Sequence, residues 1–373
     1  MSHQAYTNRN VLTAAQERVS WIFDNYKSEE IIVSISGGKD STVLAHLMLS
    51  EANRRGVKIG IFFLDEEVVY DSTVEMVRHC MYEMFPDNTI PIWYQIEFNL
   101  TNSTSIYESQ LKCWEKGKHE IWMRTREPNS IHHKPWNTET EIRNKYNGLG
   151  FYEVMENYER TRSGCAHIVG LRAIESPNRW KAVVNKKTKK GVYWGTDIAN
   201  DSCKYYPIYD WNFSDIWRYI KENNLRYSKI YDMQYKKGFA VTEMRVSSLV
   251  HEKSFRAIVE LAEFEPKTYE RMTKRMDGIK VAALYGKEDK MFKFKKLPNA
   301  YKSWKDYRDF LLANHEAEHK DIFVKRFSKQ FDNEYVARQQ VRQLVMNDYE
   351  NNLSIKNRPD PKALKREFWE SVL

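Results

Sequence analysis

The chain has 373 residues, of which 42% are hydrophobic and 14% aromatic, and 59 basic against 51 acidic residues give a net charge of +8. This composition excludes a disordered or fibrous chain and supplies enough apolar residues for one large domain or two ordinary ones. The polar N-terminus, the lack of an apolar run near ~18 residues and four widely spaced cysteines predict a cytoplasmic protein without a membrane span or an iron–sulfur cluster. The moderate positive charge is compatible with an anionic nucleotide or a nucleic acid and requires neither.

Strands and helices are predicted to alternate through the first part of the chain. The expected strands are 31–35, 58–64, 90–98, 165–169 and 204–211. The expected helices are 10–27, 73–85, 151–162 and one that begins near residue 214, and a β-hairpin is expected at 181–195. This alternation indicates an α/β fold with a doubly wound, mainly parallel sheet and right-handed crossovers.

A glycine-rich turn follows the first predicted strand and reads Ser36-Gly37-Gly38-Lys39-Asp40-Ser41. Two adjacent glycines allow positive φ and remove the Cβ atoms that would keep an anion away from the backbone. The N–H groups of the loop and of the following helix then point at one spot, which suits phosphate or pyrophosphate. The loop is neither a Walker A motif nor a GxGxxG turn, and it resembles the PP-loop of the ATP pyrophosphatase superfamily.

Two further groups of polar residues follow predicted strands. Asp65 and Glu66 come directly after the strand ending at Leu64, and the stretch 170–179 follows the strand at 165–169. Ligands of parallel sheets bind beyond the carboxyl ends of the strands, so these residues are expected beside the loop. Arg172 and Arg179 supply planar guanidinium groups suited to phosphate or sulfate.

Residues 100–150 interrupt the alternation and are interpreted as an insertion or a lid over the strand ends. Aromatic and basic residues interleave here, which is typical of a surface that stacks bases and contacts phosphates, or else of a packed insertion. These residues are Trp114, Trp122, Arg124, Arg126, His132, His133, Lys134 and Trp136.

The C-terminal part is predicted to be almost wholly helical. We expect a nucleotide-binding domain at 1–240, which includes the insertion, and a helical domain at 241–373. The expected C-terminal helices are 254–264, 268–276, 304–315, 334–345 and 361–372. Residues 315–319 read His-Glu-Ala-Glu-His, an HExxH match that suggests zinc bound on one helix face with Glu316 as general base. Its polar surroundings and the lack of a clear third ligand favour a surface helix instead.

Three motifs in order carry a family resemblance: SGGKDS (36–41), GLRAIESPNR (170–179) and YPIYDWNFSDIWRYI (206–220). Together they resemble the phosphoadenosine phosphosulfate (PAPS) reductase family over about residues 10–235, with an adenine nucleotide alpha-hydrolase-like fold. Within that superfamily the chain looks most like the immunoglobulin-binding regulator A-like branch. That likeness implies a ParB-like protein partner.

The resemblance implies ATP, adenylyl sulfate or PAPS as ligand, with Mg²⁺ assisting. The implied nucleotide-binding residues are Ser36, Gly37, Gly38, Lys39, Asp40, Ser41, Leu64, Asp65, Glu66, Gly170, Arg172, Glu175, Ser176 and Arg179. Lys39, Asp40, Arg172 and Arg179 are the implied catalytic residues, and Asp40 and Asp65 are the candidates for Mg²⁺.

The chain departs from the reductases in its cysteines. No cysteine follows Cys203, so the nucleophilic cysteine of their C-terminal tail is missing. Where relatives often show an Arg-x-Gly-Cys run, this chain reads Met244-Arg245-Val246-Ser247-Ser248. Cys165 and Cys203 are expected to be small buried hydrophobic residues.

Two functions therefore compete. The first is an enzyme that binds ATP or an adenylyl sulfate and performs adenylyl transfer with pyrophosphate release, or sulfonucleotide or sulfur-transfer chemistry. The second is a nucleotide-sensing regulator acting with a ParB-like partner, on DNA in one version. A zinc peptidase based on 315–319 is a distant third.

Overall fold

The computed structural model describes most of the chain. The described residues are 9–105, 108–145, 148–184, 187–241, 243–251, 254–279, 297–315, 317–349, 351 and 353–358. Within this part, contacts divide the chain into two compact units, each built from several segments.

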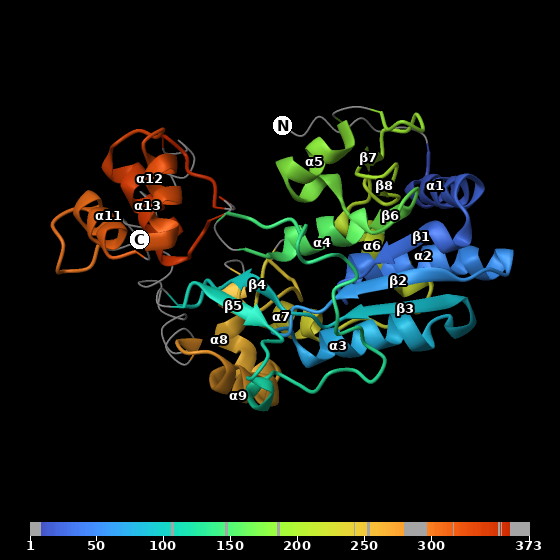
Figure 1. Cartoon of the computed structure of the whole chain (residues 1–373), viewed down its shortest axis with the longest axis horizontal. Coiled ribbons are helices and arrows are strands. Elements are labelled where there is room, and N and C mark those ends of the chain that lie inside the picture. The colour runs from blue at the N-terminus through green and yellow to red at the C-terminus, as the bar shows by residue number, and fades with distance from the viewer. Residues whose placement is uncertain are drawn as a thin grey trace. The chain divides into compact units, whose positions relative to one another are not determined.

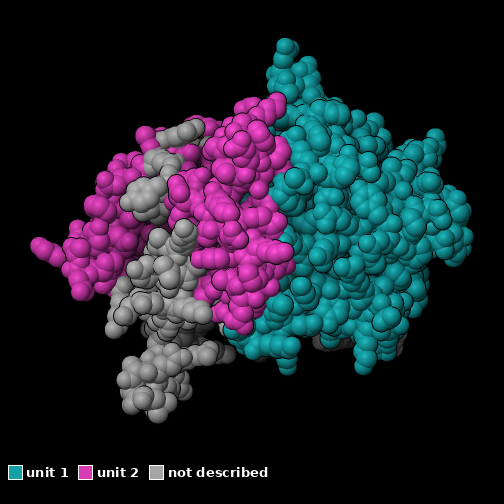
Figure 2. Space-filling view, turned by 90° about the horizontal axis from the view of Figure 1, so that it is seen from below, with its two compact units in different colours: residues 1–98, 124–142, 151–247 teal, residues 99–123, 143–150, 248–373 magenta. Residues whose placement is uncertain are grey.

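The first unit contains residues 1–98, 124–142 and 151–247, drawn in teal in Figure 2, and holds a six-stranded sheet. Its order is β3-β2-β1-β6-β8-β7 (Figure 1). The strands are β1 (Ile31–Ser34), β2 (Ile59–Leu64), β3 (Thr89–Tyr94), β6 (Ala166–Val169), β7 (Gly195–Asp197) and β8 (Cys203–Tyr205). All neighbouring strands are parallel except β7, which runs antiparallel to β8. The predicted mainly parallel sheet is confirmed.

Helices cover both faces of this sheet, as a doubly wound fold requires. Those of the first unit are α1 (Val11–Asn25), α2 (Lys39–Arg55), α3 (Asp71–Arg78), α4 (Phe151–Arg160), α5 (Pro177–Val184), α6 (Phe213–Glu222) and α7 (Ile230–Lys236). Ile31 and Val33 of β1 join one buried core with α1, α2, α3 and α6. On the opposite face Tyr158 of α4 packs against Phe62, with ring centroids 4.5 Å apart. Because both faces are buried, the central strands are apolar throughout rather than alternating.

Several predicted elements differ from the observed ones. The expected hairpin at 181–195 is wrong, because residues 177–184 form helix α5. Pro177 has a φ already suited to a first helical turn, and Ser176 Oγ accepts the backbone N–H of Arg179 at 3.2 Å, which caps the helix. The strand expected at 204–211 is shorter and ends at Tyr205, before Pro207, which has no N–H for a ladder.

The helix predicted at 73–85 and the strand predicted at 90–98 are each divided into two elements. Helix 73–85 consists of α3 followed by a π-helical turn, His79–Glu83. Strand 90–98 ends at Tyr94, and Phe98–Thr101 forms a separate strand, β4, which pairs with β5 (Gln110–Cys113) in a two-stranded sheet.

The second unit contains residues 99–123, 143–150 and the described part of 248–373, drawn in magenta in Figure 2. Its helices are α8 (Phe255–Phe264), α9 (Pro266–Arg275), α11 (Trp304–Ala313), α12 (Ala317–Phe327) and α13 (Glu334–Val345). A small core joins Ile322, Phe323 and Phe327 to Leu344 and Tyr349. The helix predicted at 361–372 lies outside the described residues. In the described part of the chain, no helix is long and apolar enough to cross a membrane.

The segment predicted as one insertion, 100–150, is shared between the units. Residues 124–142 belong to the sheet unit, while 99–123 and 143–150 belong to the helical one. In the sheet unit Ile131 bridges to Tyr94 at the end of β3, and Arg124 binds the carbonyl of Glu67 at 2.6 Å. Part of the segment therefore does cover the carboxyl ends of the strands.

Candidate nucleotide-binding site

The loop between β1 and α2 depends on its two glycines for different reasons. Gly37 has φ +68°, and a Cβ placed there would lie 2.6 Å from the carbonyl oxygen of Thr73. Only glycine fits this combination of positive φ and close backbone approach. Gly38 has φ −84°, and a Cβ there would meet nothing nearer than 3.4 Å. Gly37 therefore fixes the turn, whereas Gly38 keeps the loop surface open.

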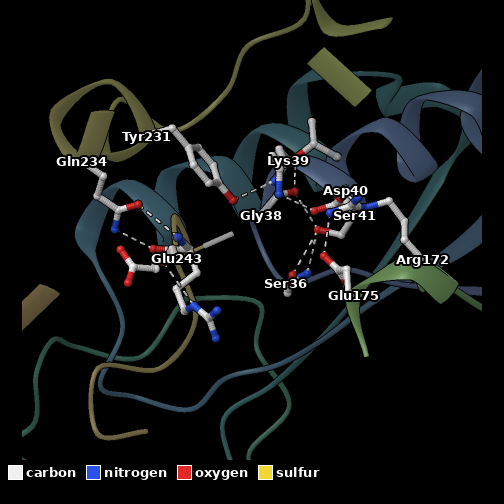
Figure 3. A network of polar contacts seen from close by, with 12 residues as sticks. Ser36, Gly38, Lys39, Asp40, Ser41, Arg172, Glu175, Tyr231, Gln234 and Glu243 are labelled. Carbon is white, nitrogen blue, oxygen red and sulfur yellow. Dashed lines mark hydrogen bonds and ion pairs between the residues drawn. The ribbon is translucent and has the colours of Figure 1, made fainter. Parts of the chain in front are cut away.

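Hydrogen bonds hold the loop in a tight conformation (Figure 3). The N–H of Ser36 donates to Ser41 Oγ at 3.1 Å, and that hydroxyl donates to the carbonyl of Gly38 at 2.9 Å. The first N–H groups of α2 have no partner within the helix, and the helix dipole places partial positive charge there. This loop conformation favours phosphate binding at residues 36–41, which stays a prediction.

A chain of ion pairs connects the loop to the segment after β6. Lys39 Nζ lies 2.7 Å from Asp40 Oδ2, and Arg172 Nε lies 2.5 Å from Asp40 Oδ1. Arg172 Nη2 also lies 2.6 Å from Glu175 Oε1, and the other oxygen of Glu175 pairs with Arg179. Figure 3 shows this chain from Lys39 to Glu175. Three of the predicted site residues beyond the loop, Arg172, Glu175 and Arg179, are therefore brought together with it.

Burial strengthens the electrostatics of this cluster. Lys39 and Arg172 are only 6% and 4% exposed. Burial lowers the pKa of Lys39, and Asp40 opposes that shift. Charges in such a poorly hydrated place interact more strongly than on the surface, so an incoming anion can compete with Asp40 and Glu175 for the cations.

Strand order places the two segments side by side. β1 and β6 are neighbours at the point where the strand order reverses, which is where open α/β sheets bind ligands. A Cβ on Gly170 would lie 3.4 Å from the backbone of Asp40, in ordinary van der Waals contact, so the end of β6 packs directly against the first turn of α2.

Asp65 has a different environment from the one predicted. It is fully buried, its Oδ2 accepts the Trp93 and Gln95 side-chain N–H groups at 2.9 Å each, and its Oδ1 pairs with Arg124. A metal or ribose contact from Asp65 would require these bonds to break first. Leu64 is buried at the end of β2, and Glu66 follows one residue beyond Asp65.

The residues do not form a ready Mg²⁺ site. Asp40 is already neutralised by Lys39 and Arg172, and Asp65 by Arg124. Among the described residues, no group of three His, Cys, Asp or Glu side chains is placed to hold a metal ion.

Sequence reasoning missed residues that approach the loop from α7. The N–H of Lys39 donates to Tyr231 Oη at 3.2 Å, and Tyr231 is 3% exposed. Gln234, one turn later on α7, hydrogen-bonds the backbone of Arg245. Residues 244–248 differ from the run that relatives often show, and this difference could have drawn attention to Arg245. Nothing in the sequence distinguished Tyr231 from a core tyrosine.

Cys165 and Cys203 lie away from this loop, whereas Cys80 contacts Thr42, whose hydroxyl donates to the carbonyl of Gly38. All four are buried, as expected for Cys165 and Cys203. Cys165 precedes β6 and Cys203 begins β8, so both stand at the opposite ends of their strands from the loop edge. Burial raises the pKa of the Cys203 thiol to about 11 and that of Cys80 to about 12. Neither is a ready thiolate nucleophile.

The HExxH interpretation is wrong in its structural premise. Helix α12 begins at Ala317, so His315 precedes the helix and does not share a helical face with His319. His319 is buried, stacks on Tyr349 with ring centroids 4.7 Å apart, and contacts the side-chain nitrogen of Gln110 at 3.0 Å.

The aromatic and basic residues of 100–150 are used largely for packing. Trp114 is fully buried against Trp122, and Trp136 and Lys134 both contact the Glu141 carboxylate, at 3.0 Å and 2.9 Å. These contacts favour the packed insertion over a base-stacking surface.

Comparison with known proteins gives two matching families. Residues 30–237 match the phosphoadenosine phosphosulfate reductase domain, and residues 238–357 match a domain of unknown function, DUF3440. The chain is 28% identical over 315 residues to the uncharacterized protein YbdN of Escherichia coli (strain K12), covering 81% of this chain and 75% of that protein.

The chain is also similar to proteins named as reductases. The chain is 25% identical over 231 residues to adenosine 5'-phosphosulfate reductase of Bacillus cereus (strain Q1), covering 62% of this chain and 80% of that one. The crystal structure of phosphoadenylyl-sulfate (PAPS) reductase from Candida auris in its phosphate complex matches with a TM-score of 0.34 and 11% identity, covering 62% of this chain and 94% of that one.

Proposed function

The chain belongs to the phosphoadenosine phosphosulfate reductase domain family, a family of sulfonucleotide-related enzymes, and from this premise we propose that it binds an adenosine nucleotide and activates its α-phosphate. The ligand is ATP or an adenylyl sulfate, with its phosphates on residues 36–41 and its adenosine toward Leu64–Glu66. The observation that carries this proposal is the turn at Gly37 and Gly38 with the buried cations Lys39 and Arg172 directly beside it. We place this reaction in the cytoplasm.

The chemistry that this arrangement supports is charge stabilisation. An acceptor attacks the α-phosphorus and forms a bond to it, the bond from the α-phosphorus to the leaving oxygen breaks, and pyrophosphate (from ATP) or sulfate (from an adenylyl sulfate) departs with the electron pair. The loop N–H groups and Lys39 hold the leaving oxyanion, while Arg172 and Arg179 neutralise charge that grows in the transition state. Because these groups are held in fixed positions, they also orient the nucleotide for attack by the acceptor.

Magnesium, when bound with the nucleotide, would neutralise part of the phosphate charge. Asp40 is already paired with Lys39 and Arg172, so its carboxylate is not available to hold the ion in this arrangement.

The buried thiols argue against reduction of PAPS by a cysteine of this chain. Thiol attack needs an accessible thiolate, and burial raises the pKa values of Cys80 and Cys203 well above the ordinary range. We therefore propose adenylyl transfer or other sulfonucleotide chemistry without a protein thiol.

One observation favours the second candidate, a nucleotide-sensing regulator with a ParB-like partner. The loop is hydrogen-bonded to α7, and α7 in turn holds the backbone at Arg245, three residues before the last segment of the second unit, which starts at residue 248. Binding of a nucleotide at residues 36–41 would change these hydrogen bonds between the loop, α7 and Arg245. Pyrophosphate release would support the enzyme, and nucleotide-dependent partner binding without turnover would support the regulator.

Calorimetric titration with ATP, adenylyl sulfate and PAPS, each with Mg²⁺, tests the proposal. The Gly38→Asp variant places a carboxylate at the anion site, and because a Cβ there meets nothing nearer than 3.4 Å, the fold should tolerate it. We expect micromolar binding to the wild type, loss of binding in Gly38→Asp, and substantial retention in the uncharged control Gly38→Asn. Absence of binding for all three nucleotides would overturn the proposal.

A further inference from the structure

Helix α5 (Pro177–Val184) buries little of its own surface. Of its eight residues only Val183 is buried, whereas Trp180 and Val184 are 56% and 42% exposed. Pro177, Trp180 and Val184 are spaced at three and four residues, so they form one exposed apolar stripe along the helix. Short helices are stable mainly because an apolar face packs against another surface. The stripe on α5 is therefore a candidate binding surface.

The chain around this stripe is strongly basic. Residues 177–193 contain six basic residues and no acidic one, and the whole chain has a net charge of +8. Lys181 on α5 and Lys187 just beyond it are both exposed, and within the described residues neither forms an ion pair. Lys189, by contrast, pairs with Asp201 at 2.6 Å. An anionic partner can therefore contact Lys181 and Lys187 without breaking an ion pair.

A second exposed aromatic ring accompanies these lysines. Tyr193 is 56% exposed, and Lys187 Nζ lies 5.0 Å from the centroid of its ring. Tyr193 stands two residues before β7, an edge strand of the sheet. Helix α5 contacts the same strand (Figure 1), because Thr196 Oγ1 donates to the carbonyl of Ala182 at 3.3 Å. Trp180 and Tyr193 thus belong to two segments that meet at one edge of the sheet.

The mixture of rings and lysines favours a nucleic acid over a protein as the partner. Protein interfaces enclose aromatic residues in a core from which lysine is depleted. Single strands of nucleic acid instead stack their bases on exposed rings while cations contact the phosphates between them. In a duplex the bases are already stacked on one another, so exposed rings favour a single strand.

We propose that single-stranded nucleic acid binds the α5–β7 surface, which consists of Trp180, Lys181, Lys187 and Tyr193. The two rings stack on bases, and the two lysines contact phosphates. Arg179, the neighbour of Trp180 in the chain, pairs with Glu175 in the ion-pair cluster beside the loop, so a strand bound here lies close to the proposed nucleotide site. The inference goes beyond the proposed function and does not depend on it.

Fluorescence anisotropy titrations of the full chain with labelled oligodeoxythymidine and oligouridine, each of about 16 nucleotides, test this inference. We expect binding that weakens as salt rises, because phosphate contacts release counterions. Trp180→Ala should weaken binding about fivefold or more through loss of one stacked base, whereas Trp180→Phe should keep most of the affinity. Tyr235→Ala, which removes a 70% exposed ring from α7, is the matched control and should behave as wild type. Tighter binding of one polymer assigns a ribose or a deoxyribose strand.

The two lysines have a separate readout. The slope of log K against log salt should become shallower by about 1.4 in the double variant Lys181→Gln, Lys187→Gln, since each phosphate contact on a single strand contributes about 0.7. Lys236→Gln, which removes an exposed lysine from α7, should leave the slope unchanged.

Absence of binding to either oligonucleotide at low salt would overturn the inference, as would equal weakening by Trp180→Ala and Tyr235→Ala. Displacement of the strand by polyglutamate at equal charge concentration would also overturn it, because that result assigns an acidic protein partner. Nucleotide titrations report on the proposed function separately. Failure of the wild type to bind ATP, with oligonucleotide binding intact, would overturn only that function.

Discussion

Gly37 offers the sharpest test of how the loop is built. In Gly37→Ala the new Cβ would lie 2.6 Å from the carbonyl oxygen of Thr73 and 2.8 Å from its methyl group, at φ +68°. Left-handed backbone costs a non-glycine residue about 1–2 kcal/mol, and forcing an extra methyl into a packed place costs about 1–3 kcal/mol. We therefore expect the free energy of unfolding to fall by about 2–5 kcal/mol.

Gly38→Ala is the matched control for this prediction. Its φ of −84° is ordinary, and the nearest atoms to the new methyl are 3.4 Å away, so we expect a change within about 0.5 kcal/mol. Urea denaturation followed by tryptophan fluorescence and by circular dichroism measures both variants. A second variant, Gly37→Ala with Thr73→Ser, removes the methyl clash but not the carbonyl clash and should recover only part of the loss. Equal stability of Gly37→Ala and Gly38→Ala would refute the reasoning.

Three further predictions follow from the buried polar groups. Arg172→Met leaves Asp40 without its guanidinium partner, so ATP affinity should fall at least tenfold by calorimetry, and an unaffected affinity would contradict the ion-pair assignment. Burial lowers the pKa of His167 from 6.5 to about 4, so below pH 6.5 the unfolded chain binds a proton that the folded chain does not. In urea denaturation, the free energy of unfolding of the wild type should therefore fall by about 3 kcal/mol between pH 7 and pH 4, and that of His167→Met should fall by less. Identical pH profiles for the two proteins would contradict the assignment of this loss to His167. Cys165→Ala and Cys203→Ala should each leave pyrophosphate release within twofold of wild type, and abolished release would point back to a thiol mechanism.

Local sequence was sufficient for the sheet and for the loop. The apolar run at 31–35, the paired glycines after it and the alternation of strands and helices each depend on neighbouring residues, and a parallel sheet with this loop at its carboxyl edge follows from them. The position of residues 170–179 just after a predicted strand likewise placed Arg172, Glu175 and Arg179 beside the loop, and ion pairs through Asp40 and Glu175 join them to it.

Other features required the tertiary structure. Valines and aromatic residues suggested a hairpin at 181–195, but the capped first turn at Ser176 and Pro177 gave helix α5. Asp65 looked like a ligand because it follows a strand, yet packing surrounds it with Trp93, Gln95 and Arg124.

The sequence by itself therefore determined the fold class and the position of the loop at residues 36–41, since both arise from local periodicity and glycine conformation. Only the tertiary structure decided which distant residues complete the site. Tyr231 is 192 positions from Lys39 in the chain, and Thr73 is 173 positions from Val246. No local propensity encodes such pairs, because they form only when helices packed on a common sheet bring their side chains to the same edge.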